Sequence, residues 1–471
     1  MSFIRSGILL FVAIAILSAC ASEPSRRLAD MEKIYDTDGP ITSLYHAALY
    51  YPDQVALRYD GYIVGIEKSE RDRINVNNDV PVKGITGVIS KEDAKSRVDD
   101  FKLMFVSHII RNGASPNSGN GATDAWSREL RAGASCAIYN AYAYDNAAQD
   151  KQFARPCDPQ VNGTTLLPSA AFAQSWTALD KLGASLQKRL DGSDYTHVVV
   201  LVMGWNTVQE EAVRNFNSLA ANLIAAHRFN ADQAKDDNTF KPLFIGVTWP
   251  SQWNSKWADP IMKLFSFGVK ASDADEVGLT WLGVLLHQTI PQNIKNQKLI
   301  VIGHSFGARA TSVASCAGPV LFRAGDPVPI DKPIDTLVNL QGAYLIGRLI
   351  GGEKEKGFHY PQDCPAVKNL VLTASDHDKA VAAARWGSYV GLGATYKAQC
   401  NGGAPRVNCA VALPNGTISD LRKIAGSTIT YVDASDLISE NAYETGGGAH
   451  SDIYRREDGI FIRQAMELPS K

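Results

Sequence analysis

Short, almost entirely apolar runs alternate with longer segments of helical spacing from residue 169 onward. A continuous run of Val, Ile and Leu is typical of a strand buried on both faces, and alternation with helices is typical of a parallel sheet with crossover helices. The first helix is expected over Ala170–Leu190, and strands over Val198–Met203, Leu243–Thr248, Leu299–Ile302, Thr336–Leu340, Leu370–Ala374 and Thr428–Val432. The pattern predicts one α/β domain over residues 169–471, with a mostly parallel sheet flanked by helices.

Residues 44–168 are assigned to an N-terminal extension with strands and loops. Residues 55–66 are expected to form two short strands around an Asp60-Gly61 turn, and residues 103–109 a further strand. The stretch 112–162 is rich in Gly, Ala, Ser and Asn and holds two cysteines. This composition predicts a long loop region stapled by disulfides.

The first twenty residues have the layout of an export sequence. Arg5 is followed by the apolar run Ile8–Leu17 and then by Ser18-Ala19-Cys20. The run is too short for a transmembrane helix, which needs about 20 apolar residues. Leu17-Ser18-Ala19-Cys20 resembles the bacterial lipobox, in which cleavage occurs before the cysteine and the cysteine is acylated. A plain signal peptide with a chance cysteine is the alternative.

This resemblance implies a lipoprotein signal peptide over residues 1–19 and a lipid anchor on Cys20. The polar residues 20–43 are then a tether between the lipid and the folded part. Ala21 follows the cysteine, and by resemblance to enterobacterial sorting this favours the outer membrane over the inner one. We expect an outer membrane lipoprotein of the bacterial cell envelope, on its periplasmic or surface face.

The remaining cysteines fit an oxidising compartment. Six are left without Cys20, and an even number in an exported chain suggests disulfides, for which 15 pairings are possible. Closeness in the chain favours Cys400–Cys409 and Cys136–Cys157, which leaves Cys316–Cys364; buried free thiols are the alternative. No cysteine or histidine group has zinc spacing, and we expect no metal. The net charge of −2 gives no electrostatic reason to bind nucleic acid.

Gly303-His304-Ser305-Phe306-Gly307 lies between an expected strand and a helix of small residues. A serine becomes a useful nucleophile where a sharp turn lifts its oxygen clear of the sheet. Such a turn strains the serine backbone and leaves no room for side chains at Gly303 and Gly307. The strand–turn–helix context therefore favours Ser305 as a nucleophile over a purely structural turn.

A nucleophilic serine needs a base, and in this type of site the acid follows the serine and the histidine comes last. His304 directly precedes the serine, and we expect its side chain to point away into the fold. His359, His377 and His450 follow at a distance. We favour His450, because it lies in a glycine-rich loop after the last expected strand.

The acid should follow a late strand. Strand 370–374 ends in Ser375-Asp376-His377-Asp378, and one of the two aspartates is expected to be the acid, while the other caps the helix expected from about Lys379. Its role is to hold the histidine tautomer and stabilise the imidazolium. Asp433 and Asp436 follow the next strand and are weaker candidates.

An oxyanion needs backbone N–H groups aimed at the developing charge. One is expected from Phe306, which follows the nucleophile. The other is expected from Trp205 in Met203-Gly204-Trp205-Asn206-Thr207, directly after a strand. An ordinary strand-to-helix turn is the alternative reading of that loop.

These segments resemble the α/β-hydrolase superfamily, and more narrowly the bacterial DUF900-type hydrolases. Gly204-Trp205-Asn206-Thr207 within Val198–Asn217 is similar to that family's His-Gly-Tyr-Asn segment, and Thr248-Trp249-Pro250-Ser251 to its Trp-Pro-Ser. The segment Ala374–Ala380 resembles its Ser-x-x-Asp, which places the acid at Asp378 and leaves Asp376 as the alternative. His450-Ser451 resembles its terminal histidine. The resemblance covers about residues 190–455.

One residue departs from the family pattern. Met203 stands where the family usually has a histidine that supports the loop after the strand. The aromatic segment 251–270 is expected to be either a lid that grips acyl chains or lies on a membrane, or the buried face of an inserted helix.

The resemblance implies a serine hydrolase that cleaves an acyl ester without a cofactor. Its partners would be a small-molecule or lipid ester substrate and, through Cys20, the membrane. Two alternatives stay open: a non-catalytic envelope lipoprotein that binds a partner, and an acyltransferase that uses the same residues.

Overall fold

The structure, a computed structural model, describes the part of the chain that carries most of the expected helices and strands. The described residues are 57–68, 104–112, 135–141, 156–157, 168–204, 209–231, 240–249, 271, 273–323, 333–350, 360, 364–380, 387–402, 405–440 and 448–468. The expected signal peptide, Cys20, the tether and the segment 251–270 lie outside these residues, and what was expected of them stays a prediction.

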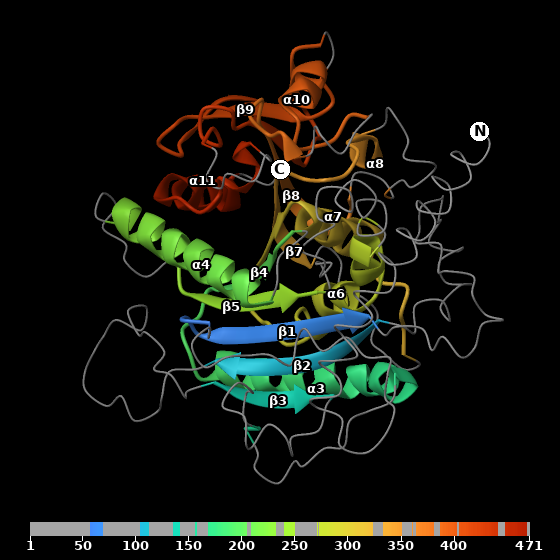
Figure 1. The fold of residues 1–471 in the computed structure, drawn as a ribbon. Helices are drawn as coiled ribbons and strands as arrows, with labels where there is room; N and C mark the ends of the chain where they lie inside the picture. Colours follow the sequence, from blue (N-terminus) through green and yellow to red (C-terminus); the bar gives the residue numbers. More distant parts are fainter. Residues whose placement is uncertain are drawn as a thin grey trace, which may run out of the picture.

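Within the described residues, one sheet holds eleven strands (Figure 1). In chain order they are β1 Gly61–Lys68, β2 Met104–Asn112, β3 Cys136–Asn140, β4 His197–Val202, β5 Pro242–Thr248, β6 Lys298–His304, β7 Ile334–Leu340, β8 Val367–Ala374, β9 Asn408–Ala412, β10 Ile418–Arg422 and β11 Ile429–Asp433. Their order across the sheet is β10-β9-β11-β8-β7-β6-β4-β5-β1-β2-β3. The block from β9 to β1 is parallel throughout. Antiparallel strands flank it, with β10 at one end and β2 and β3 at the other.

The strand order reverses at β4, which positions the candidate site. β5 pairs with one side of β4, and β6 pairs with the other. In parallel sheets, ligands bind at the carboxyl ends of the strands beside such a reversal. Val202 and His304 are the last residues of β4 and β6. The loops that follow these two residues therefore meet at the edge of the sheet where a site is expected.

Helices cover both faces of the sheet (Figure 1). The described ones are α3 Pro168–Asp191, α4 Gln209–Ala231, α6 Trp281–Val284, α7 Phe306–Ser312, α8 Gly347–Ile350, α10 Gly393–Cys400 and α11 Arg456–Glu467, with the π-helical turns η3 Leu285–Thr289 and η4 Val313–Ala317 and the 3-10 turn η5 Ala449–Ser451. Their packing follows from the two-residue repeat of the strands. Val199 and Leu201 belong to the apolar cluster that includes α4 and α11. Val200 and Val202 belong to the cluster on the opposite face.

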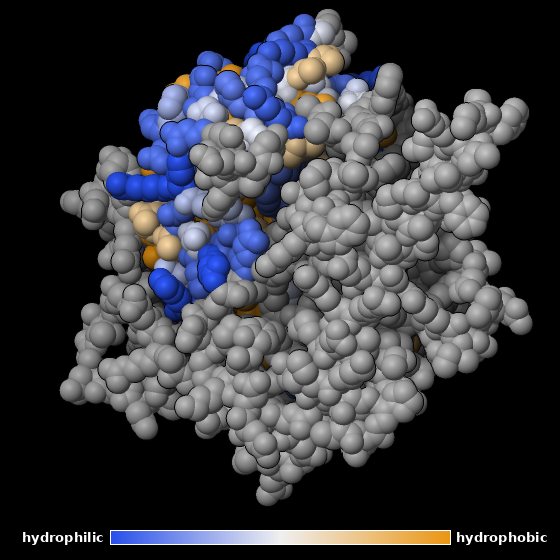
Figure 2. Space-filling model, viewed as in Figure 1, coloured by the Kyte–Doolittle hydropathy of each residue, from blue (hydrophilic) through white to orange (hydrophobic). Residues whose placement is uncertain are grey.

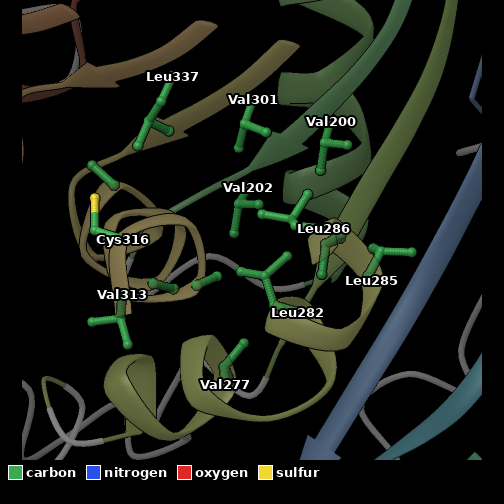
Figure 3. Close-up of a cluster of buried hydrophobic side chains, with 14 of the residues drawn as sticks. Val200, Val202, Val277, Leu282, Leu285, Leu286, Val301, Val313, Cys316 and Leu337 are labelled. Atoms are coloured by element: carbon green, nitrogen blue, oxygen red, sulfur yellow. The ribbon is translucent and has the colours of Figure 1, made fainter. Parts of the chain in front are cut away.

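The second of these clusters is the core beneath the candidate site. Figure 3 shows Val200, Val202, Val301 and Leu337 of three neighbouring strands facing Leu282 and the π-helical turns. The five side chains named here are completely buried. Burial on both faces explains why the strands read as continuous apolar runs in the sequence. The fold class predicted from those runs is confirmed.

Most elements expected from the sequence lie where they were placed, within three residues at either end. The exception is the prediction of two strands over residues 55–66, which is wrong for the residues of this segment that the structure describes. Residues 57–60 form no strand, and Asp60-Gly61 is the start of β1 instead of a hairpin turn. The Asp60 carbonyl accepts a hydrogen bond from Phe244 N–H at 3.0 Å, which holds the chain against β5. Pairing with β5 therefore overrides the local turn preference.

Strand β3 was also missed, because it lies inside the stretch 112–162 that was expected to be loop. The segment 379–426 contributes two further strands, β9 and β10, that no apolar run in the sequence predicts. Strands β1, β2 and β3 extend the sheet of the α/β domain beyond β5, so the sheet is continuous across the expected boundary at residue 169. That boundary itself stays a prediction.

Three disulfides join the cysteines in the pairing that closeness in the chain favoured. They are Cys136–Cys157, Cys316–Cys364 and Cys400–Cys409. The first ties β3 to residues 156–157, and the last joins α10 to β9. Cys316 lies in η4, close behind the helix that follows Ser305. The bridge from Cys316 to Cys364 therefore fixes the far end of that helix to the entry of β8.

The described surface visible in Figure 2 is mostly hydrophilic, with small separate apolar spots over α4, α10 and α11. Of the described helices, not one combines the length and the apolar character that a membrane span requires.

Three buried histidines make the free energy of unfolding depend on pH. Burial lowers the pKa of His108, His197 and His304 to about 3. Between about pH 6.5 and pH 3 the unfolded chain binds a proton at each of these sites and the folded chain does not. Stability is therefore lost on acidification, by up to about 1.4 kcal/mol per pH unit for each histidine.

We predict that His108→Gln reduces this pH slope, by a small amount at pH 7.5 and by up to about 1.4 kcal/mol per pH unit near pH 5. Urea unfolding of the oxidised protein between pH 7.5 and 5 measures it. Burial raises the pKa of Glu276 and Asp458 to about 7, which acts in the opposite sense, so the comparison is of variant with wild type. His377→Gln, at an exposed histidine, is the matched control. An unchanged slope in His108→Gln would contradict the prediction.

Candidate active site

Ser305 occupies the sharp turn between β6 and α7. Its backbone angles are φ 57° and ψ −120°, a conformation that costs a residue with a side chain of order 1–3 kcal/mol. Two backbone hydrogen bonds hold the turn. Ser305 N–H donates to the Leu340 carbonyl at 3.0 Å, and Ala343 N–H donates to the Ser305 carbonyl at 3.2 Å. The chain at and after the end of β7 thus holds Ser305 in its strained conformation. Ser305 is 7% exposed.

The glycines on either side of the serine are required by space. A Cβ at Gly307 would lie 2.1 Å from the Val202 carbonyl oxygen, and one at Gly303 would lie 2.3 Å from Thr311 Oγ1. Both contacts are far shorter than van der Waals distance, and the first is to backbone that cannot move aside. Helix α7 therefore starts immediately against the end of β4. This is the packing that the Gly-x-Ser-x-Gly spacing predicts.

The loop after β4 comes directly to the serine. A Cβ placed on Gly204 would lie 2.5 Å from Ser305 Cβ and 3.1 Å from Ser305 Oγ. Met203, the departure from the family pattern, is buried, and its carbonyl accepts a hydrogen bond from the Trp249 indole N–H at 2.9 Å. Tyr454 O–H reaches the Met203 sulfur at 3.5 Å. In this chain Trp249 and Tyr454 hold the loop. Trp205 lies outside the described residues, and Phe306 is the first residue of α7.

His450 and Asp378 meet at the same edge of the sheet. His450 Nδ1 lies 2.8 Å from Asp378 Oδ2, and the Asp378 side chain is fully buried. A carboxylate only accepts hydrogen bonds, so Nδ1 carries the proton and Nε2 is the basic nitrogen. The loop around His450 is anchored near Asp378 as well, because Asp378 bridges to Gly448 and Ala449 N–H donates to the His377 carbonyl at 3.0 Å.

The other acidic candidates are exposed or contact residues other than His450. Asp376 is exposed and pairs with Lys397, while its N–H donates to Ser435 Oγ. Asp433 accepts hydrogen bonds from the backbone and hydroxyl of Ser435, and Asp436 is exposed. Of the two aspartates after β8, Asp378 is therefore the one that contacts the histidine. The candidate base His359 lies outside the described residues, and His377 is exposed.

His304 is part of the site, which the sequence analysis did not foresee. It is buried as expected, but its Nε2 lies 2.8 Å from the His450 carbonyl oxygen, and the two rings are 4.9 Å apart. Burial lowers the pKa of His304 to about 3, so the ring is neutral near pH 7 and its Nε2–H donates to that carbonyl. His304 thus holds the backbone of His450, while Asp378 holds its ring.

Asp452 anchors the same loop from its other side. It is buried, and its Oδ2 accepts hydrogen bonds from Ser439 N–H at 3.0 Å and Glu440 N–H at 2.8 Å. Arg455 donates to the same oxygen at 3.0 Å. No sequence pattern predicted this role of Asp452. An acidic residue two positions after a candidate base is the weak signal that could have prompted it.

The described residues bring together no three His, Cys, Asp or Glu side chains that could hold a metal ion. The candidate site consists of a serine after β6, an aspartate after β8 and a histidine in the loop after β11. Such a set can carry out nucleophilic catalysis. The aromatic segment 251–270, expected to be a lid or a buried helix face, lies outside the described residues.

The parallel sheet, its crossover helices and the strained serine turn define an α/β-hydrolase fold. Residues 179–397 match the family model described as "Alpha/beta hydrolase of unknown function (DUF900)". The resemblance predicted from the sequence is thereby confirmed. The match begins before the expected start at residue 190 and ends before His450, so the placement of that histidine depends on the structure. Comparison with curated proteins and with solved structures gives no match.

His304 can be tested apart from any activity. We predict that His304→Leu destabilises the protein by about 1–3 kcal/mol, because the His450 carbonyl loses a buried donor. Hydrogen exchange measured by mass spectrometry should also become faster at residues 449–452. His287→Leu is the matched control, since His287 Nε2 lies 2.8 Å from the Ala314 carbonyl, away from this loop. Equal exchange at residues 449–452 in the two variants would contradict the role of His304.

Proposed function

We propose that this protein is a serine hydrolase that cleaves an acyl ester. Two observations carry the proposal. Ser305 is strained, at φ 57°, and His450 has its Nδ1 2.8 Å from a buried carboxylate and its carbonyl oxygen 2.8 Å from the side chain of His304, the residue before that serine. Strain in a non-glycine residue is retained where function requires it. A purely structural turn at this position has no need for a histidine and an aspartate at the same edge of the sheet.

The proposed reaction uses each residue in turn. Ser305 Oγ attacks the acyl carbonyl while His450 Nε2 takes its proton, and the histidine then donates that proton to the leaving alcohol. Water, activated by the same nitrogen, cleaves the acyl-enzyme and releases the acid and the free serine. Asp378 keeps the proton on Nδ1 and stabilises the imidazolium that forms.

The oxyanion would be held by backbone N–H groups on either side of the serine. Phe306 N–H follows the nucleophile, and Trp205 N–H belongs to the loop that Gly204 brings against Ser305. Support for this assignment comes from the distance of 2.5 Å between Ser305 Cβ and a Cβ built on Gly204, a contact too short for any side chain at that position. The fixed position of the Met203 carbonyl, bound by Trp249, supports the same loop.

The test is labelling with a fluorophosphonate probe, with the modified residue located by mass spectrometry. We predict labelling at Ser305 in the wild type and none in Ser305→Ala. In His450→Ala and in Asp378→Asn the labelling rate should be lower by a factor of about 10³ or more. Asp376→Asn is the matched control and should react as wild type does, because Asp376 pairs with Lys397. Short p-nitrophenyl esters then test turnover.

The same experiment decides between the alternatives. An absence of labelling in oxidised, folded protein would overturn the hydrolase proposal and favour a lipoprotein that binds a partner. Labelling without hydrolysis, together with transfer of the acyl group to an added alcohol, would indicate an acyltransferase. Amide and ester substrates with the same acyl group would separate those two bond types.

We also propose that the protein is anchored in the bacterial envelope through lipid on Cys20. The sequence Leu17-Ser18-Ala19-Cys20 supports this proposal. Bacteria expressing the chain and fed an alkynyl fatty acid should incorporate the label at Cys20. Cys20→Ser should remove the label and release the protein from the membrane fraction, whereas Ser18→Thr should keep both. Release without any loss of label would contradict the anchor.

A further inference from the structure

Gln341 is a second residue in contact with the carboxylate of Asp378. It follows β7, the strand next to β8, and its side chain is completely buried. Gln341 Nε2 lies 3.1 Å from Asp378 Oδ2, the same oxygen that binds His450 Nδ1. A buried amide that follows the neighbouring strand therefore reaches the same carboxylate oxygen as the histidine.

Thr373 fixes which end of the Gln341 amide faces Asp378. Gln341 backbone N–H donates to Thr373 Oγ1 at 2.9 Å, so the hydroxyl is already an acceptor there. The hydroxyl hydrogen is directed to Gln341 Oε1, 3.0 Å away. Because Oε1 is thereby engaged as an acceptor, the NH₂ end of the amide must point to Asp378. The orientation that donates to the carboxylate follows from this network.

The backbone of Gln341 is strained to achieve this contact. Its φ is 47°, in the left-handed region that residues with a side chain rarely adopt. Gly391 closes the site on the other side, where a Cβ would lie 3.1 Å from Asp378 Oδ2 and 3.0 Å from the Gln341 carbonyl carbon. A left-handed conformation in a buried glutamine persists only where its surroundings hold it, and such residues gather at functional sites.

We propose that Gln341 is a positioning residue for the reaction assigned above, and that Thr373 orients it. The amide donates to Asp378 Oδ2 and fixes the direction of the carboxylate, so that the same oxygen meets His450 Nδ1. Gln341 contacts neither the substrate nor the reacting atoms, and its effect passes through Asp378. This inference depends on the proposed function for its kinetic consequence, but the geometry can be tested without it.

Gln341→Met keeps the length of the side chain and removes the donor. The rate of fluorophosphonate labelling at Ser305 should fall about tenfold, the size expected for one hydrogen bond to a charged group. In ester turnover kcat should fall and KM should stay unchanged. Thr373→Val should lower the rate in the same way, since Gln341 then loses both hydrogen bonds that hold its backbone and its amide in place. Thr373→Ser keeps the hydroxyl and should react at nearly the wild-type rate.

A double-mutant cycle shows whether Gln341 acts through Asp378. In an Asp378→Asn background, Gln341→Met should change the labelling rate by less than about twofold, because the contact it supports is already lost. A merely structural role would lower the rate equally in both backgrounds. An equal loss, or no loss in either, would overturn the proposal.

Proton NMR gives a readout that is independent of hydrolysis. The Nδ1–H of His450, assigned by its absence in His450→Ala, should be seen in wild type and broadened by exchange with water in Gln341→Met. Asn339→Leu is the matched control: it removes a buried amide from the same strand, but one that binds Thr311 and Tyr344. It should lower stability and keep the signal.

The two proposals can fail separately. Wild-type protein that is not labelled would contradict the hydrolase function alone, and the NMR signal would then decide the role of Gln341. Loss of the signal in Gln341→Met but not in Asn339→Leu supports that role. A signal unchanged in Gln341→Met overturns it, whatever the protein's activity.

Discussion

The parallel alignment of the strands is the constraint on which the rest of the structure depends. Every strand of the parallel block ends at the same edge of the sheet, so residues far apart in the chain meet there. Ser305 follows β6, Gln341 follows β7, and Asp378 follows β8. The burial of Val200, Val301 and Leu337 against the helices keeps these strands in register. Chemistry at the edge is therefore positioned by apolar packing below it.

Much of this arrangement could be read from the sequence because it follows from local patterns. Apolar runs located the strands, and glycine spacing located the turn at Ser305. The expected order of serine, acid and histidine along the chain favoured His450. The same order left two aspartates after β8 as candidates for the acid, and the contact with His450 distinguishes Asp378 from Asp376. The strained turn at Ser305 follows from local glycine spacing, whereas the placement of the acid at Asp378 came from the resemblance to the hydrolase family.

The remaining features depend on contacts between distant segments, and no local pattern carries them. Asp60-Gly61 looks like a hairpin turn, but pairing with β5 makes it the start of a strand. His304 and Asp452 support the His450 loop only because the fold brings distant residues together. His304 and His450, for example, are 146 positions apart in the chain and lie within hydrogen-bond distance. Gln341 carries no charge, and no motif in the sequence marks it. Its role depends on the orientation that Thr373 imposes, which needs coordinates to be seen.

The continuity of the sheet past β5 bears on how the chain can be divided. Strand β1 pairs along β5 from Phe244 to Thr248, and both of its own faces are buried. A fragment that started at residue 169 would leave β5 as an exposed edge, with unpaired backbone groups and uncovered apolar side chains. Such edges recruit strands from other molecules. Residues 61–68 therefore cover an edge of the α/β-hydrolase sheet that would otherwise be open to such pairing, although they lie outside the matched family segment.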